Sequence, residues 1–205
     1  MQASSSARLG ESARRALLRI ARGAIARRLD RADDTRDPER VPTDTAQIDR
    51  PAGAFVTLRL PADRPGGPAG LRGCIGTLEA TAPLWCAVAD AAERAAFEDP
   101  RFPPLEADEL ERVSIHLSVI GPRRRVTHAH EIRLGIDGVV LERGPARAVF
   151  LPQVAIEQRW ELGQLLEHLA RKAGLDAGDW KAAELYAFET EAFSEATPRG
   201  QDAGG

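Results

Sequence analysis

The chain has 205 residues, enough to bury a sizeable core, and its 28 basic and 31 acidic side chains give a net charge of −3. No overall positive field would collect nucleic acid or acidic lipid, so we expect neither nucleic acid nor a membrane as a partner. The two cysteines, Cys74 and Cys86, cannot build a disulfide framework, and no apolar run approaches the length of about 18 residues that suggests a membrane span. These features predict a cytoplasmic protein.

The chain is predicted to begin with a flexible tail over residues 1–10, followed by a single domain over residues 11–196. Small apolar residues at helical spacing, with arginines on the other face, indicate a helix over residues 11–30. Residues 31–52 are charged and hold three prolines, which predicts a loop. A second flexible tail is predicted over residues 197–205.

Two strands are expected next. Residues 54–60 are rich in β-branched and apolar side chains, and residues 71–78 would return as their antiparallel partner after a turn dense in proline and glycine over residues 61–70. A helix with a slim face of alanines is expected to open at Pro83. It leads into residues 98–104, where three prolines predict a stiff loop.

The second half of the chain shows further strands of the antiparallel type. Residues 113–120 alternate apolar and polar side chains, and residues 138–151 have the pattern of a hairpin. An amphipathic helix is indicated over residues 160–173, and a closing strand over residues 185–193. Hairpin-type strands interrupted by helices predict an α+β fold, with a mainly antiparallel sheet flanked by helices.

Residues 71–77 carry the most unusual local chemistry. Two glycines flank Cys74 inside a predicted strand, and glycine in a strand usually marks a bulge or a close approach of backbone. The alternation of a regular strand would place Arg72 and Cys74 on the same face. Cys74 is then either a reactive thiol beside a cation or a buried structural thiol, and it has no histidine nearby in the sequence to act as its base.

The histidines give weaker signals. His128 and His130 form an HxH pattern two residues after a run of three arginines, which indicates exposed surface rather than a metal site. His116 lies on the polar side of a predicted strand, where it either makes a cross-strand hydrogen bond or faces a cleft. No nucleotide-binding, serine-hydrolase or zinc-protease motif is found, and we expect neither a metal nor a cofactor.

Taken together, residues 53–58, 71–77 and 99–105 resemble the AMMECR domain family, and the likeness extends over residues 11–196. Bacterial and archaeal members of that family are called AmmeMemoRadiSam system proteins. The resemblance implies an α+β fold with a larger and a smaller subdomain around a cleft, and it places the strand of Cys74 near that cleft. It also implies a link to a Memo-like protein and to a radical S-adenosylmethionine enzyme.

Two functions follow as hypotheses. The first is an accessory protein that binds a small anionic ligand or a partner, with arginines as forked donors and glycines that expose backbone N–H groups. Its binding residues would be Arg72, Gly73, Cys74, Gly76, Thr77, Asp99, Arg101 and Phe102. The alternative is a thiol-dependent enzyme in which Cys74, the single catalytic candidate, acts as nucleophile or carrier.

Overall fold

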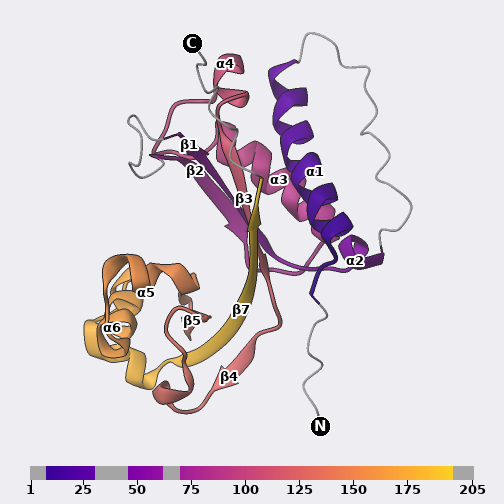
Figure 1. Ribbon diagram of the computed structural model, residues 1–205. Helices are drawn as coiled ribbons and strands as arrows, with labels where there is room; N and C mark the ends of the chain where they lie inside the picture. The colour runs from indigo at the N-terminus through magenta and orange to yellow at the C-terminus, as the bar shows by residue number, and fades with distance from the viewer. Residues whose placement is uncertain (1–7, 31–45, 62–69, 196–205) are drawn as a thin grey trace, which may run out of the picture. The chain divides into compact units, whose positions relative to one another are not determined.

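The computed structural model describes residues 8–30, 46–61 and 70–195. These residues form two compact units (Figure 1). The larger unit contains the described residues up to Val119 and those from Glu191 onward, and the smaller unit contains residues 120–190. The predicted tail at 197–205 and most of the turn at 61–70 lie outside the described residues. The predicted cleft between two subdomains stays a prediction.

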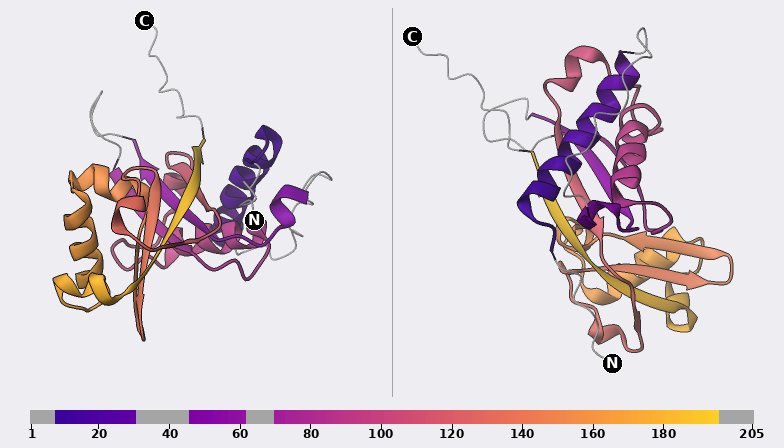
Figure 2. Two further views of the ribbon diagram at one scale, coloured as in Figure 1. Left: turned by 90° about the horizontal axis from the view of Figure 1, so that it is seen from below. Right: turned by 90° about the vertical axis from the view of Figure 1, so that its right-hand side faces the viewer.

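The described residues of the larger unit form the helices α1 (Glu11–Leu29), α2 (Ala46–Asp49), α3 (Leu84–Phe97) and α4 (Ala107–Leu110). The predictions of α1 and α3 are confirmed, and the two helices pack side by side, as the right-hand view of Figure 2 shows. Their contact faces are rich in alanine, which permits a close approach of the two backbones. No helix among the described residues is long and apolar enough to cross a membrane.

Two sequence predictions fail at the start of the chain. Residues 46–49 were expected in a loop but form α2, because Ile48 is buried in the core of the larger unit. Leu9, expected in a flexible tail, is only 3% exposed, and its N–H donates to a carboxylate oxygen of Glu191 at 3.0 Å. In both cases a single apolar side chain fixes a segment that looks polar in the sequence.

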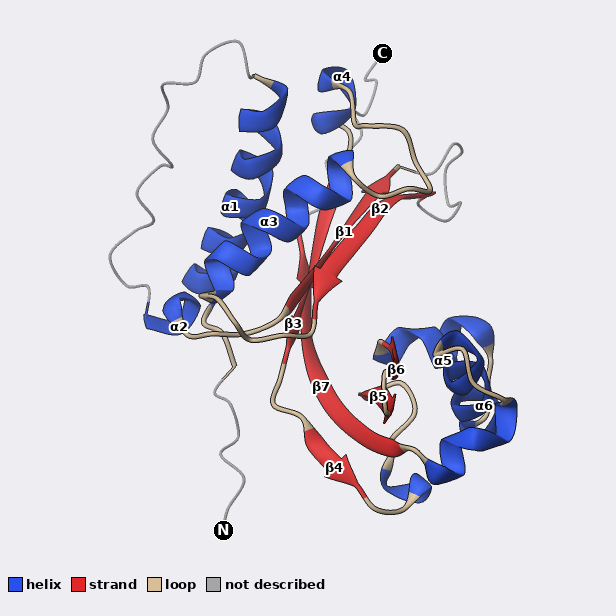
Figure 3. Ribbon diagram, turned by 180° about the vertical axis from the view of Figure 1, so that it is seen from behind, coloured by secondary structure: helices blue, strands red, loops and turns tan. Residues whose placement is uncertain are grey.

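The sheet of the larger unit contains β1 (Ala54–Leu60), β2 (Gly70–Thr77), β3 (Ser114–Ile120) and the end of β7 (Glu184–Ser194), in the antiparallel order β2-β1-β3-β7. Figure 3 shows α1 and α3 on one side of these strands. Alternate residues of β1 and β3, such as Val56 and Leu117, face the helices and form the core.

The other face of the same strands is polar. It holds Phe55, Thr57, Cys74, Ser114, His116 and Ser118, all of them half-buried. We call this set of residues the polar face. None of its members is in either apolar core cluster, so their side chains are free for roles other than core packing.

The arginines of α1 hold the last strand in place. Arg14 pairs with Glu191, and Arg22 pairs with Glu195 while donating to two backbone carbonyls. These contacts tie the first helix of the unit to its last strand. Two of the arginines of α1 therefore have structural roles.

The smaller unit contains β4 (Arg124–Val126), β5 (Asp137–Arg143), β6 (Ala146–Phe150) and the first part of β7. It also contains α5 (Pro152–Gln158), α6 (Leu162–Lys172) and the 3-10 turns η1 (Ala129–Glu131) and η2 (Ala177–Ala182). Leucines of α6 pack on β5 and β7 to form its core. The predicted hairpin, helix and closing strand are confirmed.

Two elements of the smaller unit were not predicted. Arg124 and Arg125, expected in an exposed loop, form β4 on the edge of β7. The pairing places Arg124 at 2.7 Å from the buried carboxylate of Asp137, which Arg133 also contacts. Helix α5 was missed because its seven residues give too short a periodic pattern to recognise.

Candidate functional site

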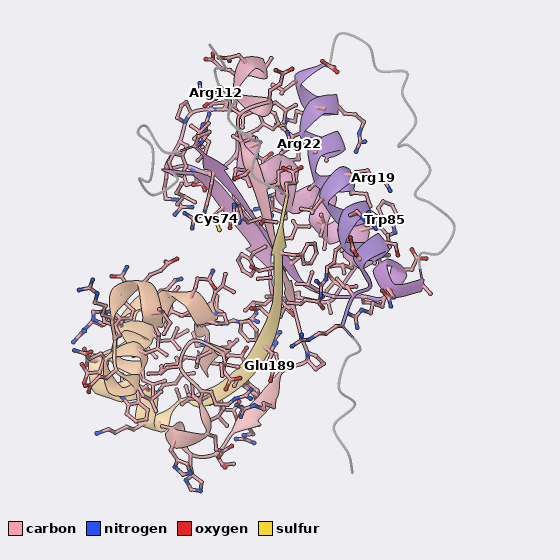
Figure 4. All side chains as sticks on the ribbon, viewed as in Figure 1. Arg19, Arg22, Cys74, Trp85, Arg112 and Glu189 are labelled. Carbon is pink, nitrogen blue, oxygen red and sulfur yellow. The ribbon has the colours of Figure 1, made fainter. Side chains whose placement is uncertain are left out.

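Cys74, Thr57 and His116 form a row across three neighbouring strands. Thr57 on β1 lies opposite Cys74 on β2 and opposite His116 on β3. The Thr57 hydroxyl donates to the Cys74 sulfur at an Oγ1–Sγ distance of 3.2 Å. Figure 4 shows the sulfur on the side of the strands away from α1. The thiol is half-buried and free of any disulfide.

His116 lies at the other end of this row. Its Nε2 is 3.2 Å from the hydroxyl oxygen of Ser114, which belongs to the same strand and is not the cross-strand partner that the sequence analysis expected. The alternative, that His116 faces a cleft, stays a prediction. Burial lowers the pKa of His116, and the positive charge of Arg59 lowers it further, although Glu195 opposes this shift. The imidazole is therefore neutral at neutral pH.

A β-bulge separates Arg72 from Cys74. Leu58 pairs with Gly73 and Arg59 pairs with Leu71, so Arg72 is the extra residue of β2. The bulge turns the Arg72 side chain into the protein, whereas Cys74 lies on the polar face. The prediction that these two side chains share a face was therefore wrong, because it assumed a regular strand.

Arg72 is a structural residue. It is 6% exposed, and its Nε and Nη2 each donate to the Glu109 carboxylate at 2.7 Å. Its remaining donors reach the carbonyls of Pro103 and Pro104 at 2.9 and 3.3 Å. Hydrogen bonds from Arg72 lower the pKa of Glu109 despite its partial burial. Because Glu109 and two carbonyls engage its donors, Arg72 is not a candidate for binding a ligand.

The two glycines of this strand are required by packing. A Cβ atom on Gly73 would lie 2.1 Å from the carbonyl oxygen of Ala95 on α3. On Gly76 it would lie 2.3 Å from the carbonyl oxygen of Ala54 and 2.6 Å from the ring of Phe55. The backbone approach that the glycines indicated is thus made by the protein itself. The expectation that they expose N–H groups to a ligand has no support.

Asp99 and Arg101 clamp the free edge of β2 at Cys74. The Cys74 N–H donates to Asp99 Oδ2 at 2.8 Å, and Nη2 of Arg101 lies 3.4 Å from the Cys74 carbonyl oxygen. Arg101 also donates to both oxygens of Asp99, at 2.9 and 2.7 Å. These bonds, with those from two backbone N–H groups, hold the pKa of Asp99 well below its usual range against the effect of burial.

The loop that carries the clamp is stabilised by a turn and by a contact between two side chains. The Phe102 N–H donates to the Asp99 carbonyl at 3.1 Å, which closes a turn with Pro100 at its second position. The guanidinium of Arg101 lies 5.5 Å from the centre of the Phe102 ring. Asp99 and Arg101 therefore contact Cys74 directly, and Phe102 contacts Arg101. That these residues bind a ligand stays a prediction.

The other candidates lie elsewhere. Thr77 accepts a hydrogen bond from the N–H of Glu79, which stabilises the turn after β2. Burial, assisted by the charge of Asp49, raises the pKa of Cys86 on α3. His128 and His130 stack on each other at η1, and within the described ranges no three histidine, cysteine or acidic residues form a metal-binding group.

Thr57 and Glu109 were missed in the sequence. Thr57 looks like an ordinary strand residue, and its role depends on its pairing with Cys74 of the neighbouring strand. Glu109 is three residues from Glu106, a spacing typical of the capping box that the two residues form at the start of α4. That spacing could have located α4 but could not have indicated Arg72 as a partner.

Comparisons with known proteins agree on one family. The family model described as AMMECR1 matches residues 18–193. A protein of Methanococcus aeolicus is 38% identical over 160 residues, which cover 74% of this chain and 78% of the relative. A protein of Methanocaldococcus jannaschii is 39% identical over 157 residues, covering 73% and 76%. The crystal structure of an uncharacterized protein from Pyrococcus horikoshii matches with a TM-score of 0.77 and 34% identity, over 90% of this chain and 92% of that one.

Proposed function

The chain belongs to the AMMECR1 family, and from this premise we propose that it is an accessory protein that binds a ligand or a partner around Cys74. The observation that carries the proposal is the row of Cys74, Thr57 and His116 on the polar face. A sulfur, a hydroxyl and a neutral imidazole lie side by side there, outside the apolar core. Such convergent polar groups are typical of a recognition surface.

The partners proposed first are those that the family resemblance implies, a Memo-like protein and a radical S-adenosylmethionine enzyme. The contacts that Asp99 and Arg101 make with the edge of β2 support a role in binding such a partner. The clamp of Asp99 and Arg101 holds both the backbone and the surroundings of Cys74 in one conformation. A preorganised surface loses little entropy on binding, which favours affinity.

Binding is favoured over catalysis because, in the part of the chain that the structure describes, no base is hydrogen-bonded to the thiol. A nucleophilic cysteine is commonly activated by a general base within hydrogen-bond reach, about 3 Å. His116 is two strands away from Cys74, and two strand spacings amount to about 10 Å. Thr57 occupies the position between them.

The alternative function is a thiol-dependent enzyme with Cys74 as nucleophile or carrier. One observation favours it: the Thr57 hydroxyl donates to the sulfur, and a hydrogen bond to sulfur stabilises the charge of a thiolate. In such an enzyme the substrate itself, or a partner protein, would have to supply the group that accepts the thiol proton.

A pull-down with the two partner proteins tests the proposal. The parent chain, Cys74→Ser and, as a matched control, Cys86→Ser are each immobilised and offered the purified Memo-like and radical enzymes. We expect retention by the parent and by Cys86→Ser, and weaker retention by Cys74→Ser. Equal retention by all three would remove Cys74 from the binding surface. Turnover of a substrate that is lost only in Cys74→Ser would favour the enzyme instead.

A further inference from the structure

We propose that the ligand of this site carries an anionic group, a carboxylate or a phosphate, which Arg101 holds beside the Cys74 thiol. This inference rests on the proposed function, because it names the chemistry of the ligand that the same surface would bind. It is carried by the geometry of the ion pair between Asp99 and Arg101, in which one charge is buried and the other faces solvent.

The two members of the pair differ sharply in exposure. The Asp99 side chain is 3% exposed, whereas that of Arg101 is 54% exposed. A ligand approaching from solvent therefore meets the guanidinium first, and it meets the carboxylate only through the protein. The buried end of the pair fixes the cation in place, and the exposed end presents its positive charge outward.

Arg101 also keeps donors for a ligand. Its Nε and Nη2 are taken by Asp99, but no described residue accepts a hydrogen bond from its Nη1. The ring of Phe102 lies against the guanidinium and restricts its plane. Guanidinium groups pair well with carboxylate and phosphate oxygens, and Nη1 of Arg101 remains available to donate to such an oxygen.

The surroundings do not oppose an anion. None of the described side chains that β1, β2 and β3 turn to the polar face is acidic. Arg72 cannot share the task, since Glu109 and two carbonyls engage it. Arg101, in contrast, lies beside Cys74. Its Nη2 is 3.4 Å from the Cys74 carbonyl oxygen, so its positive charge is close to the thiol.

Two alkylating reagents of similar size provide the test. Iodoacetate is an anion and iodoacetamide is neutral, and with either one the Cys74 sulfur forms a bond to carbon as iodide leaves and the thiol proton passes to the buffer. The rate of each reaction at Cys74 is followed by mass spectrometry of the peptide that contains it. The ratio of the two rates measures how strongly the site favours an anion.

The matched variant is the double substitution Asp99→Asn with Arg101→Gln, which preserves the net charge of the chain and replaces the ion pair by two amides. We expect the iodoacetate to iodoacetamide ratio to fall about two- to five-fold relative to the parent. Arg19→Gln, a change at an exposed arginine of α1, should leave the ratio unchanged. An equal ratio in the parent and the double variant would overturn the inference but not the proposed function.

Salt gives a second measurement that needs no variant. If Arg101 attracts the anion, raising the salt concentration lowers the ratio, because screening weakens the attraction. If only the net charge of −3 acts, screening raises the ratio, and that result overturns the inference. A thiol at Cys74 that reacts with neither reagent would show that small molecules do not reach it, which overturns this inference, whereas the proposed function is tested separately by the pull-down.

A protection experiment distinguishes the two anions. Acetate and inorganic phosphate are compared at equal ionic strength for their ability to slow the reaction of iodoacetamide with Cys74. The anion that protects the parent more than the double variant identifies the group as carboxylate or phosphate. Equal protection of both proteins by both anions would count against Arg101 as the anchor.

Discussion

Thr57 donates its hydroxyl to the sulfur of Cys74 from the neighbouring strand, at a distance of 3.2 Å. This contact joins two residues that lie 17 positions apart in the chain. It gives the thiol a polar partner on the side of the strands away from α1.

Replacing Thr57 by valine tests the contact, because valine preserves the shape and removes the hydroxyl. We expect alkylation of Cys74 by iodoacetamide at pH 7 to slow by about three- to ten-fold, since the thiolate loses a hydrogen bond. Ser118→Ala changes another hydroxyl of the polar face and should leave the rate as it is. A Thr57→Val protein that reacts as fast as the parent would show that the hydroxyl does not assist the thiol.

Gly73→Ala should destabilise the larger unit. The added methyl group would meet the Ala95 carbonyl oxygen at 2.1 Å, so β2 or α3 must move. We expect a loss of about 1–3 kcal/mol or more in the free energy of unfolding, measured by urea denaturation. Gly163→Ala is the control, because nothing lies within 4 Å of its Cβ position and alanine favours the helix. Equal stabilities of the two variants would contradict the packing explanation.

Arg72→Met should be more damaging than a change at an exposed arginine. It removes the partner of the largely buried Glu109 and of two backbone carbonyls. We expect a loss of about 2–4 kcal/mol in the free energy of unfolding. Arg94→Met, at an exposed pair on α3, should cost less than about 1 kcal/mol. Similar losses in the two proteins would mean that Arg72 is not the structural residue described above.

The lowered pKa of Asp99 predicts that the stability of the folded chain depends on pH. Its pKa is lowered in the folded chain, so the stabilisation it supplies is complete above its unfolded pKa of about 4 and is lost as the pH falls towards the folded value. Asp99→Asn lacks this titration. The difference in the free energy of unfolding between parent and variant should be largest near pH 7 and should shrink below about pH 4, as urea denaturation at several pH values would show. A difference that stays constant over this range would rule out the lowered pKa.

Much of the fold could be predicted from local patterns. The alternation in residues 113–120 and the spacing of alanines in residues 84–97 each specify one element without reference to the rest of the chain. The predictions fail where the structure of a segment depends on residues far away in the sequence. Arg124 and Arg125 look like loop residues in the sequence, and only their pairing with Ala187 and Tyr186 makes them a strand. Helix α2 depends on a buried place for Ile48.

In the candidate site, too, some residues could be predicted from local patterns, and others depend on distant parts of the chain. The sequence indicated Cys74, Asp99 and Arg101 through unusual glycines and a stiff loop. It could not show the bulge at Arg72, because that bulge depends on Glu109 and on the carbonyls of Pro103 and Pro104. The row of Thr57 and His116 beside the thiol likewise depends on the register of three strands, which no single segment contains.

The clamp of Asp99 and Arg101 also has a consequence for solubility. Strand β2 is the edge of the sheet, and an uncovered edge offers its N–H and C=O groups to a strand of another molecule. At Cys74 both groups are already engaged, the N–H by a carboxylate and the carbonyl by a guanidinium. Asp99 and Arg101 therefore keep the backbone of Cys74 from pairing with a strand of another molecule, which opposes edge-to-edge aggregation at this position.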